Sequence, residues 1–227
     1  MTVKGVIFDF AGTLFRHDRE TGWLEGVPAS TDAWDAEERE AFRTRFAAPA
    51  QLSNELPPEA RAAWEKRDLH PVFHRAAYLS LLQAAGAREP GLSELLYQRL
   101  IDPMYWKPYQ DTCLVLRKLN DMNIPVVVAS NIAWDIRTVF DLHSVTHLIS
   151  SFLMSYVEGT TKPDPQIFLT ACERMGIPPQ DALMVGDDEQ SDGGAAALGI
   201  QVKIVSPLHP NDRSGALLDA LAAHGLV

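Results

Sequence analysis

Residues 3–14 read VKGVIFDFAGTL, and this stretch decides the fold. Its apolar, β-branched run from Val3 to Phe8 predicts a strand that is buried on both faces. The run ends directly in Asp9, and Gly12 predicts a tight turn soon afterwards. Strands buried on both faces are typical of parallel sheets, in which a carboxylate at the strand end faces a cleft instead of bulk water. The opening of the chain therefore predicts the first strand of a parallel sheet with an acidic group at its edge.

The second half of the chain extends this pattern, because helix and strand signals alternate from Asp111 onward. The alternation predicts an α/β fold: a Rossmann-like, doubly wound parallel sheet with helices on both faces. Ligands of such sheets bind beyond the carboxyl ends of the strands. We expect strands at 125–129, near 147–153, at 182–185 and at 201–205, and helices at 112–122, 135–142, 165–175, 190–198 and 214–224.

Residues 16–104 differ in composition, being rich in Ala, Glu, Arg and Trp with helical periodicity. The sequence therefore predicts two domains: a core formed by residues 1–15 and 105–227, and an α-helical domain formed by residues 16–104. Within the helical domain we expect helices at 36–46, 58–67, 71–85 and 91–101, and a loop at 47–56.

The composition excludes several classes of protein. The chain has 227 residues, of which 46% are hydrophobic, so it can bury a core without disulfides. Its net charge of −10 repels nucleic acid and anionic membranes, so we expect neither as a partner, and a small anionic substrate would need local cations to hold it. The N-terminal MTVKGVIFDF is charged too early for a signal peptide, and no run approaches the roughly 18 apolar residues of a membrane helix. We therefore expect a soluble, cytoplasmic protein.

Polar side chains follow three of the expected strands at the point where each strand ends. Serine, asparagine and aspartate at such positions are also favoured helix N-caps, which is the alternative interpretation of any one of them. Three strand ends that carry such residues, together with a lysine just before a helix, favour a shared site instead. The residues concerned are Asp9, Ser130, Asn131, Lys162, Asp187 and Asp188.

Four short motifs, in this order along the chain, resemble those of the haloacid dehalogenase-like hydrolase superfamily. Asp9 lies in FDFAGTL, Ser130 in ASN, Lys162 in TKPDP and Asp187 in VGDDEQSD. The helical domain between the first and second motifs resembles the helical cap of that superfamily. The resemblance covers nearly the whole chain and implies a hydrolase with a Rossmann-like core and a cap domain that selects the substrate.

The resemblance implies that Asp9 is a nucleophile that forms a covalent intermediate. The residue chemistry agrees, because a carboxylate nucleophile divides one difficult hydrolysis into two easier steps. Gly12 permits a tight turn that brings backbone amides toward the substrate, and Thr13 would help to hold that loop. Ser130, with Asn131 and the nearby amides, would bind substrate oxygens at a helix N-terminus.

A metal ion is expected because the site is negatively charged. A carboxylate next to a dianionic phosphate suffers about 8 kcal/mol of repulsion at about 4 Å and an effective dielectric near 20. Lys162 supplies one fixed positive charge near the reacting group, which does not offset this repulsion. A hard cation held by Asp9 and Asp187 could offset it, and oxygen-only ligands favour Mg²⁺.

Position 11 departs from the phosphatases of the superfamily. By resemblance, the backbone carbonyl of Ala11 is a third metal ligand, and Asp188 and Asp192 are candidates for the layer around the ligands or, equally, for helix caps. The side chain of Ala11 stands where those phosphatases carry a second aspartate, which protonates the leaving oxygen and then activates water. General acid–base catalysis is worth about 10²–10⁴ in rate, so the substitution puts efficient cleavage of an ordinary phosphomonoester in doubt.

Three enzymatic alternatives follow. The favoured one is Mg²⁺-dependent hydrolysis of a small phosphorylated metabolite whose leaving group needs little protonation or receives its proton from the cap. The second resembles phosphonoacetaldehyde hydrolase, which has alanine at this position, cleaves a carbon–phosphorus bond and needs a cap lysine. The third resembles 2-haloacid dehalogenase, which also lacks the second aspartate but needs no metal. The possible cap acids are Asp18, Glu25, His17 and His74, and the lysines available to the second alternative are Lys66 and Lys107.

The densest cationic cluster of the expected cap is RDLHPVFHR at 67–75. One of its basic residues, Arg67, His70, His74 or Arg75, could bind a carboxylate or second anionic group of the substrate as the cap closes, and Lys66 just before the cluster is a further candidate for contacting the substrate. The alternative is that these basic residues face solvent or pair with Glu65 and Asp68. A non-enzymatic alternative is a ligand sensor or scaffold that has lost its acid–base residue. The nucleophile, the lysine and the carboxylates are all present, however, and a binding module would not need them all.

Overall fold

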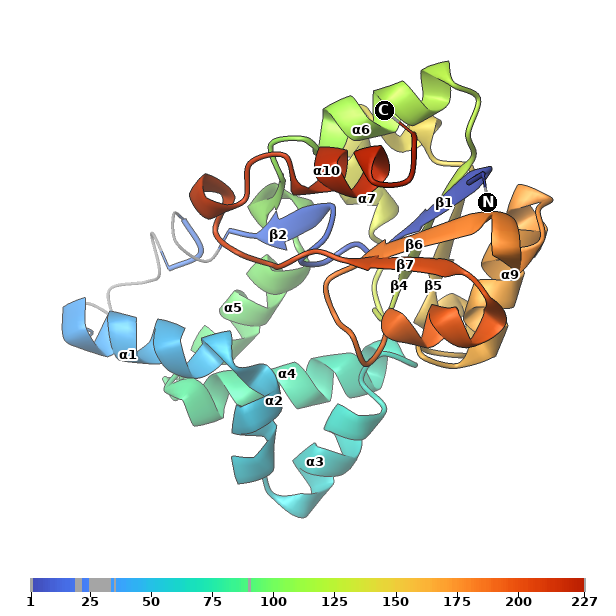
Figure 1. Cartoon of the computed structure of the whole chain (residues 1–227). Coiled ribbons are helices and arrows are strands. Elements are labelled where there is room, and N and C mark those ends of the chain that lie inside the picture. Colours follow the sequence, from blue (N-terminus) through green and yellow to red (C-terminus); the bar gives the residue numbers. More distant parts are fainter. Residues whose placement is uncertain (1, 19–21, 25–33, 35, 90, 227) are drawn as a thin grey trace. The chain divides into compact units, whose positions relative to one another are not determined.

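The computed structural model describes residues 2–18, 22–24, 34, 36–89 and 91–226. The chain forms two compact units (Figure 1). The core unit contains Met1–Arg16 and Trp106–Val227, and the helical unit contains His17–Tyr105.

The core unit is built on a five-stranded parallel sheet with the strand order β5-β4-β1-β6-β7. β1 lies in the middle, where Val6 aligns with Val126 of β4 on one side and with Leu183 of β6 on the other. The predicted α/β class with a Rossmann-like parallel sheet is confirmed. The strands are β1 (Gly5–Phe8), β4 (Val126–Ser130), β5 (Ser151–Met154), β6 (Ala182–Gly186) and β7 (Gln201–Ile204).

Helices cover both faces of this sheet, as Figure 1 shows for α6 and α10 on one face and α9 on the other. Successive residues of β1 alternate between the two layers, as side chains of a strand must. Val6 and Phe8 pack in the cluster that contains α6, α7 and α10, whereas Ile7 packs in the cluster that contains α9. These helices are α6 (Thr112–Asp121), α7 (Arg137–Leu142), α9 (Pro165–Met175) and α10 (Ala216–Ala222), and the short α8 spans Ser155–Glu158.

Most of the elements expected in the core unit form within a few residues of their predicted bounds, and the helix at 165–175 matches to the residue. Two expectations were wrong in part. The strand near 147–153 begins only at Ser151, after the 3₁₀ helix Thr146–Leu148. The α-helix at 190–198 is instead a 3₁₀ helix over Gly193–Leu198. Gly193 and Gly194 disfavour an α-helix, and the backbone of Gly194 packs closely on Pro163.

A two-stranded sheet was not predicted from the sequence. β2 (Phe15–His17) pairs with β3 (Trp106–Pro108), next to the points where the chain passes between the two units. Each strand has only three residues, too few for an alternating pattern to be recognised. The pairing was therefore not readable from local sequence.

The helical unit has its own apolar core. The rings of Trp23, Phe42 and Phe46 pack against one another, and the indole N–H of Trp23 donates to the backbone oxygen of Leu96 at 3.3 Å. None of the helices within the described ranges is long and apolar enough to cross a membrane. The helices of this unit are α1 (Ala36–Ala47), α2 (Pro49–Leu52), α3 (Pro58–Glu65), α4 (Pro71–Ala85) and α5 (Leu92–Ile101).

The loop expected at 47–56 was wrong, because this stretch forms α2 and the 3₁₀ helix Ser53–Glu55. Pro49 occupies the first helical position, where its missing N–H is not needed. The hydroxyl of Ser53 donates to the backbone oxygen of Ala50 at 2.7 Å, and Leu52 is buried in the unit's core. The composition of this segment predicts a loop, but burial of Leu52 in the core of the helical unit stabilises helical structure there.

Candidate active site

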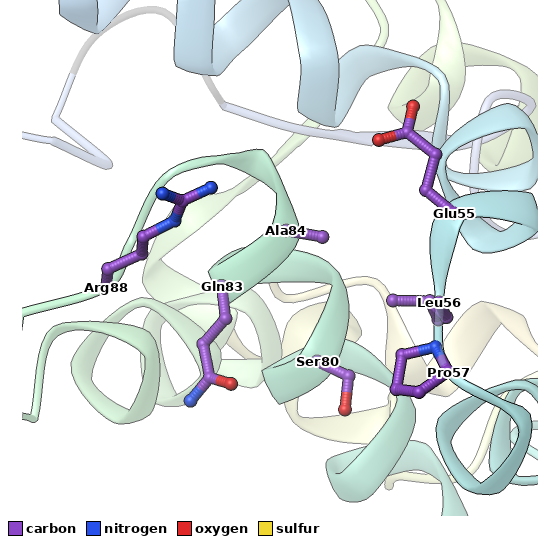
Figure 2. Close-up of a pocket in the computed structure, with 7 residues that line it drawn as sticks. All are labelled: Glu55, Leu56, Pro57, Ser80, Gln83, Ala84 and Arg88. Atoms are coloured by element: carbon purple, nitrogen blue, oxygen red, sulfur yellow. The ribbon is translucent and has the colours of Figure 1, made fainter.

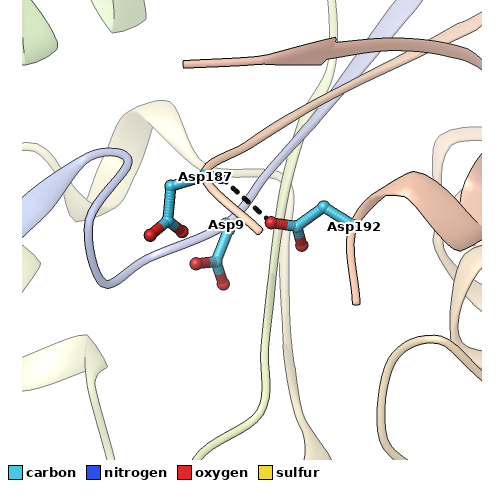
Figure 3. Close-up of side chains that lie close together, drawn as sticks. All are labelled: Asp9, Asp187 and Asp192. Carbon is cyan, nitrogen blue, oxygen red and sulfur yellow. Dashed lines mark hydrogen bonds between the residues drawn. The ribbon is translucent and has the colours of Figure 1, made fainter. Parts of the chain in front are cut away.

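The carboxyl ends of β1 and β6, which are neighbours in the sheet, bring two aspartates together. Asp9 follows β1 and donates its backbone N–H to Val185 of β6 at 2.9 Å, while Asp187 follows β6. A third aspartate, Asp192, lies in the segment after β6. Each of the three offers a carboxylate oxygen, and these oxygens lie within 4.8 Å of one another (Figure 3).

Lys162 is the cation that contacts this cluster. Its Nζ donates to Oδ1 of Asp9 and to Oδ1 of Asp192, both at 2.6 Å, and its side chain is almost completely buried. Burial acts to lower the pKa of Lys162, but the charges of Asp9 and Asp192 outweigh it and raise the pKa above its ordinary value. Lys162 therefore stays protonated and holds two of the three carboxylates.

The loop that carries Lys162 is fixed from both sides. Asn131 forms a reciprocal pair with the lysine backbone, because its amide donates to the Lys162 oxygen at 2.8 Å and accepts from the Lys162 N–H at 2.7 Å. Beyond the lysine, Asp164 caps α9 by accepting from the Gln166 N–H at 2.9 Å. Asn131 was predicted to bind substrate. In the structure its side-chain amide instead holds the backbone of Lys162 in place.

Asp192 uses both of its carboxylate oxygens within the protein. Oδ1 accepts from Lys162, and Oδ2 accepts from the backbone N–H groups of Asp187 at 3.0 Å and Asp188 at 3.1 Å. Figure 3 shows this carboxylate turned toward the Asp187 backbone. The close approach requires Gly186, since a Cβ atom there would overlap the Asp192 carboxylate. Asp192 is fully buried, and both of its carboxylate oxygens accept hydrogen bonds. It therefore holds Lys162 and the backbone of residues 187 and 188 in place.

The negative charges of Asp9 and Asp187 are not fully compensated by nearby positive charge. Burial, followed by the negative charges of Asp9 and Asp192, raises the pKa of Asp187 to about 8. Burial also raises the pKa of Asp9, and the opposing effect of Lys162 does not fully compensate for it. Three aspartates against one lysine thus leave a site that binds a proton or a cation more readily than an isolated carboxylate would.

The turn after Asp9 packs directly on Asp187. Gly12 has φ +78°, and a Cβ atom there would overlap the Asp187 carboxylate. The hydroxyl of buried Thr13 lies at the long limit of a hydrogen bond, 3.5 Å from Oδ1 of Asp187. Gly12 and Thr13 therefore set the spacing between the loop and the aspartate.

Arg213 also belongs to this region, and sequence reasoning missed it. Its guanidinium donates to the backbone oxygens of Gly12 and Thr13, the latter at 2.8 Å. The residue lies in an irregular segment before α10, where no periodic pattern or motif distinguishes it. Only the folded chain brings it to the turn after Asp9.

Three other predicted residues of the core unit have different surroundings. Ser130 is buried at the end of β4. Ala11 bridges to Phe15 and packs its side chain against the core. Asp188 lies outside the carboxylate cluster and is exposed, and its side chain accepts from the Gln190 N–H at 2.7 Å within a turn; the 3₁₀ helix that follows has Asp192 at its N-cap position.

The predicted residues of the helical unit have local partners. Arg75 pairs with Glu94, and Lys66 lies 5.7 Å from the ring centre of Phe73. His74 is buried against Tyr97, while His17 is buried and contacts the Arg99 backbone oxygen. Of the other possible acids, Glu25 lies outside the described residues, whereas the Asp18 N–H donates to Tyr105.

A surface pocket of about 540 Å³ lies within the helical unit (Figure 2). Its charged residues are Glu55, which already pairs with Arg45 at 2.9 Å, and the exposed Arg88. The pocket lacks the group of buried carboxylates found at the sheet edge, so it is not the candidate active site. It is lined by Glu55, Leu56, Pro57, Ser80, Gln83, Ala84 and Arg88.

The chain belongs to the haloacid dehalogenase-like hydrolase family, whose sequence model matches residues 3–199. It is therefore a hydrolase of that family. It is 29% identical over 213 residues to glyceraldehyde 3-phosphate phosphatase of Methanopyrus kandleri, covering 89% of this chain and 84% of the relative. It is 27% identical over 205 residues to phosphoserine phosphatase of Thermus thermophilus, covering 89% and 75%.

Solved structures share the fold at low sequence identity. A HAD phosphatase from Thermococcus onnurineus has a TM-score of 0.57 and 22% identity, with 90% of this chain and 86% of that chain covered. The L-2-haloacid dehalogenase of Xanthobacter autotrophicus has a TM-score of 0.59 and 19% identity, with 100% and 85% covered. The fold therefore accommodates both phosphatases and dehalogenases, and it does not distinguish between them.

Proposed function

We propose that the protein is a Mg²⁺-dependent phosphohydrolase that uses Asp9 as a nucleophile on a small phosphorylated metabolite. The observation that carries this proposal is the surplus of carboxylates at the sheet edge, two of them buried and Asp187 half-buried, with the pKa of Asp187 raised to about 8. A nucleophilic attack on carbon needs no cation beside the nucleophile, so it does not by itself call for an excess of carboxylates over positive charge. A phosphate-binding site needs a cation between the nucleophile and the dianion, and Asp187 fits that need.

The donor set fits a hard divalent cation. Lys162 and two backbone amides already occupy the oxygens of Asp192, so Asp9 and Asp187 are the carboxylates that would bind the ion. By family resemblance, the backbone oxygen of Ala11 joins them. All these ligands are oxygens, which favours Mg²⁺ over softer metals. The bound ion would supply positive charge to the phosphoryl oxygens and to the nucleophile.

The residues of the chain would then carry two chemical steps. A carboxylate oxygen of Asp9 attacks phosphorus, and the bond from phosphorus to the leaving oxygen breaks with its electrons on that oxygen. Water next attacks the phosphorus of the aspartyl phosphate, which releases phosphate and restores the carboxylate. Lys162 balances the charge on Asp9, and the Ser130 hydroxyl would donate to a phosphoryl oxygen.

The leaving group and the helical unit set the substrate range in this proposal. Ala11 supplies no proton, so the leaving oxygen would depart as a stable anion or take its proton from another residue or from water. We propose that the helical unit, residues 16–104 in the sequence-based division, acts as the cap. Arg75 and Lys66 are its proposed contacts to anionic substrate groups. The two phosphatase relatives favour a small phosphorylated molecule, and the net charge of −10 disfavours nucleic acid and anionic membranes.

Hydrolysis at carbon is the second candidate, favoured by one specific observation. Ala11 leaves the site without the acid–base residue that an alkoxide leaving group would need, whereas a halide leaves without a proton. In this alternative Asp9 attacks carbon and releases a halide, and no metal ion takes part. Cleavage of a carbon–phosphorus bond through a lysine Schiff base would instead require a lysine of the helical unit such as Lys66.

The proposal is tested by phosphate release from phosphomonoesters, acyl phosphates and phosphonoacetaldehyde, with halide release from 2-chloropropionate assayed in parallel. We expect phosphate release that requires Mg²⁺, stops with EDTA and returns when Mg²⁺ is restored in excess. Asp9→Asn should lower kcat by at least about 10³-fold, because the amide is a poor nucleophile.

Asp121→Asn is the matched control, since it makes the same change at an exposed carboxylate at the end of α6. It should leave kcat within about twofold of wild type, as surface substitutions usually do. Halide release that is independent of Mg²⁺ and is lost in Asp9→Asn would replace the proposal with hydrolysis at carbon. Phosphate release that survives in Asp9→Asn would contradict the nucleophile assignment.

A further inference from the structure

We propose that Arg213 is a positioning residue, which fixes the loop at residues 9–15 (the nucleophile loop) so that Asp9 meets the substrate and Asp187 in the productive geometry. The proposal rests on the proposed function for its catalytic consequence. Arg213 lies beyond residue 199, where the match to the family model ends. It is buried to 4% exposure, which is unusual for an arginine.

The nucleophile loop is held through its backbone carbonyls. Arg213 donates Nη1 to the Gly12 oxygen and Nη2 to the Thr13 oxygen. The next carbonyl, that of Leu14, accepts from the Tyr109 N–H at 3.1 Å and from the Thr112 hydroxyl at 2.7 Å. Three consecutive carbonyls of the loop are therefore bound by groups that lie outside it.

Tyr109 connects these two sets of contacts. The guanidinium carbon of Arg213 lies 3.7 Å from the centre of the Tyr109 ring, so the flat cation stacks on the aromatic face. The same tyrosine donates its backbone N–H to the Leu14 oxygen. Arg213 and the loop thus share one rigid support within the core unit.

The contacts demand an arginine in particular. Two neighbouring carbonyls match the fixed fork of a guanidinium, and its planar face suits the ring below it. Nε of Arg213 is buried and has no hydrogen-bond partner among the described residues, so the loop carbonyls are its main acceptors. A lysine would keep the charge, yet it would lose the fork and the stacking face.

The hydrogen bonds from Arg213 to the nucleophile loop affect the reacting groups, because the loop begins at Asp9 and its turn packs on Asp187. Gly12 has no room for a Cβ atom beside the Asp187 carboxylate, and the Thr13 hydroxyl lies 3.5 Å from it. A shift of the loop would therefore change the distance between Asp9 and Asp187. Misplacement by about 1 Å can cost about 10²-fold in rate, even when substrate binding is preserved.

Arg213→Lys tests the proposal through kinetics. We expect kcat to fall about 10- to 100-fold with KM within about threefold of wild type, since Lys162 and Ser130 still contact the substrate. Hydrogen exchange of the amides at positions 12, 14 and 15 should accelerate, because their bonds within the loop depend on its shape. Added guanidinium, at non-denaturing concentration, should restore part of the kcat lost in Arg213→Ala.

Two control variants separate positioning from general destabilisation. Leu218→Ala removes apolar packing from α10 on the same side of the core, and Arg117→Lys changes an exposed arginine of α6. Neither should accelerate exchange in the loop or respond to guanidinium. If Leu218→Ala, at an equal loss of stability, lowered kcat and loosened the loop as much as Arg213→Lys, the positioning role would be refuted.

The outcomes also separate this inference from the proposed function. If wild type released no phosphate from any compound, the proposed function would fail. Hydrogen exchange in the nucleophile loop would still test whether Arg213 fixes the loop. Faster exchange in Arg213→Lys would support this role, and unchanged exchange would overturn it. An active wild type with an equally active Arg213→Lys would overturn the inference alone.

Discussion

At the scale of single residues, Gly186 is where the backbone makes room for a buried carboxylate. Its lack of a side chain lets Asp192 reach the amides of Asp187 and Asp188, and the other oxygen of Asp192 then binds Lys162. The conformation of Gly186 is not the constraint, because its φ is not in the positive region. Glycine is needed there because a side chain would overlap the Asp192 carboxylate.

Gly186→Ala should therefore displace Asp192 and release Lys162 from one of its two partners. We expect kcat to fall by about 10²-fold or more and the free energy of unfolding to fall by about 1–3 kcal/mol. Steady-state kinetics and urea unfolding measure the two effects. Gly193→Ala is the control, because the atoms nearest to its added methyl group belong to the exposed, flexible side chain of Glu189. Equal losses in the two variants would contradict this account.

The sequence predicted part of the site at this scale. Asp9 and Asp187 were recognisable because each follows an apolar strand of a parallel sheet, and such strand ends meet at one edge. The contacts of Asn131 and Asp192 with Lys162 were not recognisable, since the lysine lies 31 positions from Asn131 and 30 from Asp192 and only the tertiary fold brings it within reach. Arg213 was hidden for the same reason, with its partner Thr13 separated from it by 200 positions.

At the scale of elements, α10 begins with a cap that comes from a distant segment. Asp111 precedes α6 but does not cap it with its side chain. Its Oδ2 instead accepts from the Leu217 N–H at 2.8 Å and the Leu218 N–H at 3.2 Å, which are the second and third amides of α10. Gly215, at the N-cap position of α10, has no side chain to do this.

Asp111→Ala should therefore destabilise α10 and its packing on α6. The loss of one buried acceptor for two amides predicts a decrease of about 1–2 kcal/mol in the free energy of unfolding, measured with urea. Asp164→Ala, which removes an ordinary local cap from α9, offers a comparison at about 1 kcal/mol. Hydrogen exchange should loosen α10 in the first variant and α9 in the second. Unchanged exchange in α10 would contradict the assignment of the cap.

The elements that the sequence predicted well have long apolar patterns and punctuation by proline or glycine. α9 has Asp164 as its cap, Pro165 at its first position and Gly176 at its end, so its bounds were readable directly. The missed elements, α2, β2 and β3, have three or four residues each and depend on burial or pairing with remote segments. Local pattern carries too little information at that length.

At the scale of the whole molecule, the two compact units have separate cores that contain different titratable groups. The core of the helical unit includes His74, which hydrogen-bonds Tyr97 at 3.0 Å and packs on the ring of Tyr78. Burial, followed by the positive charge of Arg67, lowers the pKa of His74 to about 4. This histidine is neutral in the folded chain at neutral pH.

The stability of the helical unit should therefore depend on pH through His74. The unfolded chain binds a proton near pH 6.5 and the folded chain only near pH 4, so stability falls as the pH falls through this window. Between about pH 7.5 and pH 5, wild type should lose about 2 kcal/mol that His74→Gln does not lose. Urea unfolding of both proteins across this range measures the difference. Parallel pH profiles would show that His74 is not the group responsible.

The central position of β1 in the sheet has a consequence for folding during translation. β1 is made before both of its neighbours: β4 follows only after the entire helical unit, and β6 follows later still, after α7, β5 and α9. At translation rates of about 5–20 residues per second, Val6, Ile7 and Phe8 wait about ten seconds or more before β6 exists. During that interval at least one edge of this apolar strand has no partner. We therefore expect the nascent chain to be prone to pairing of β1 with a neighbouring chain until its partner strands have been made.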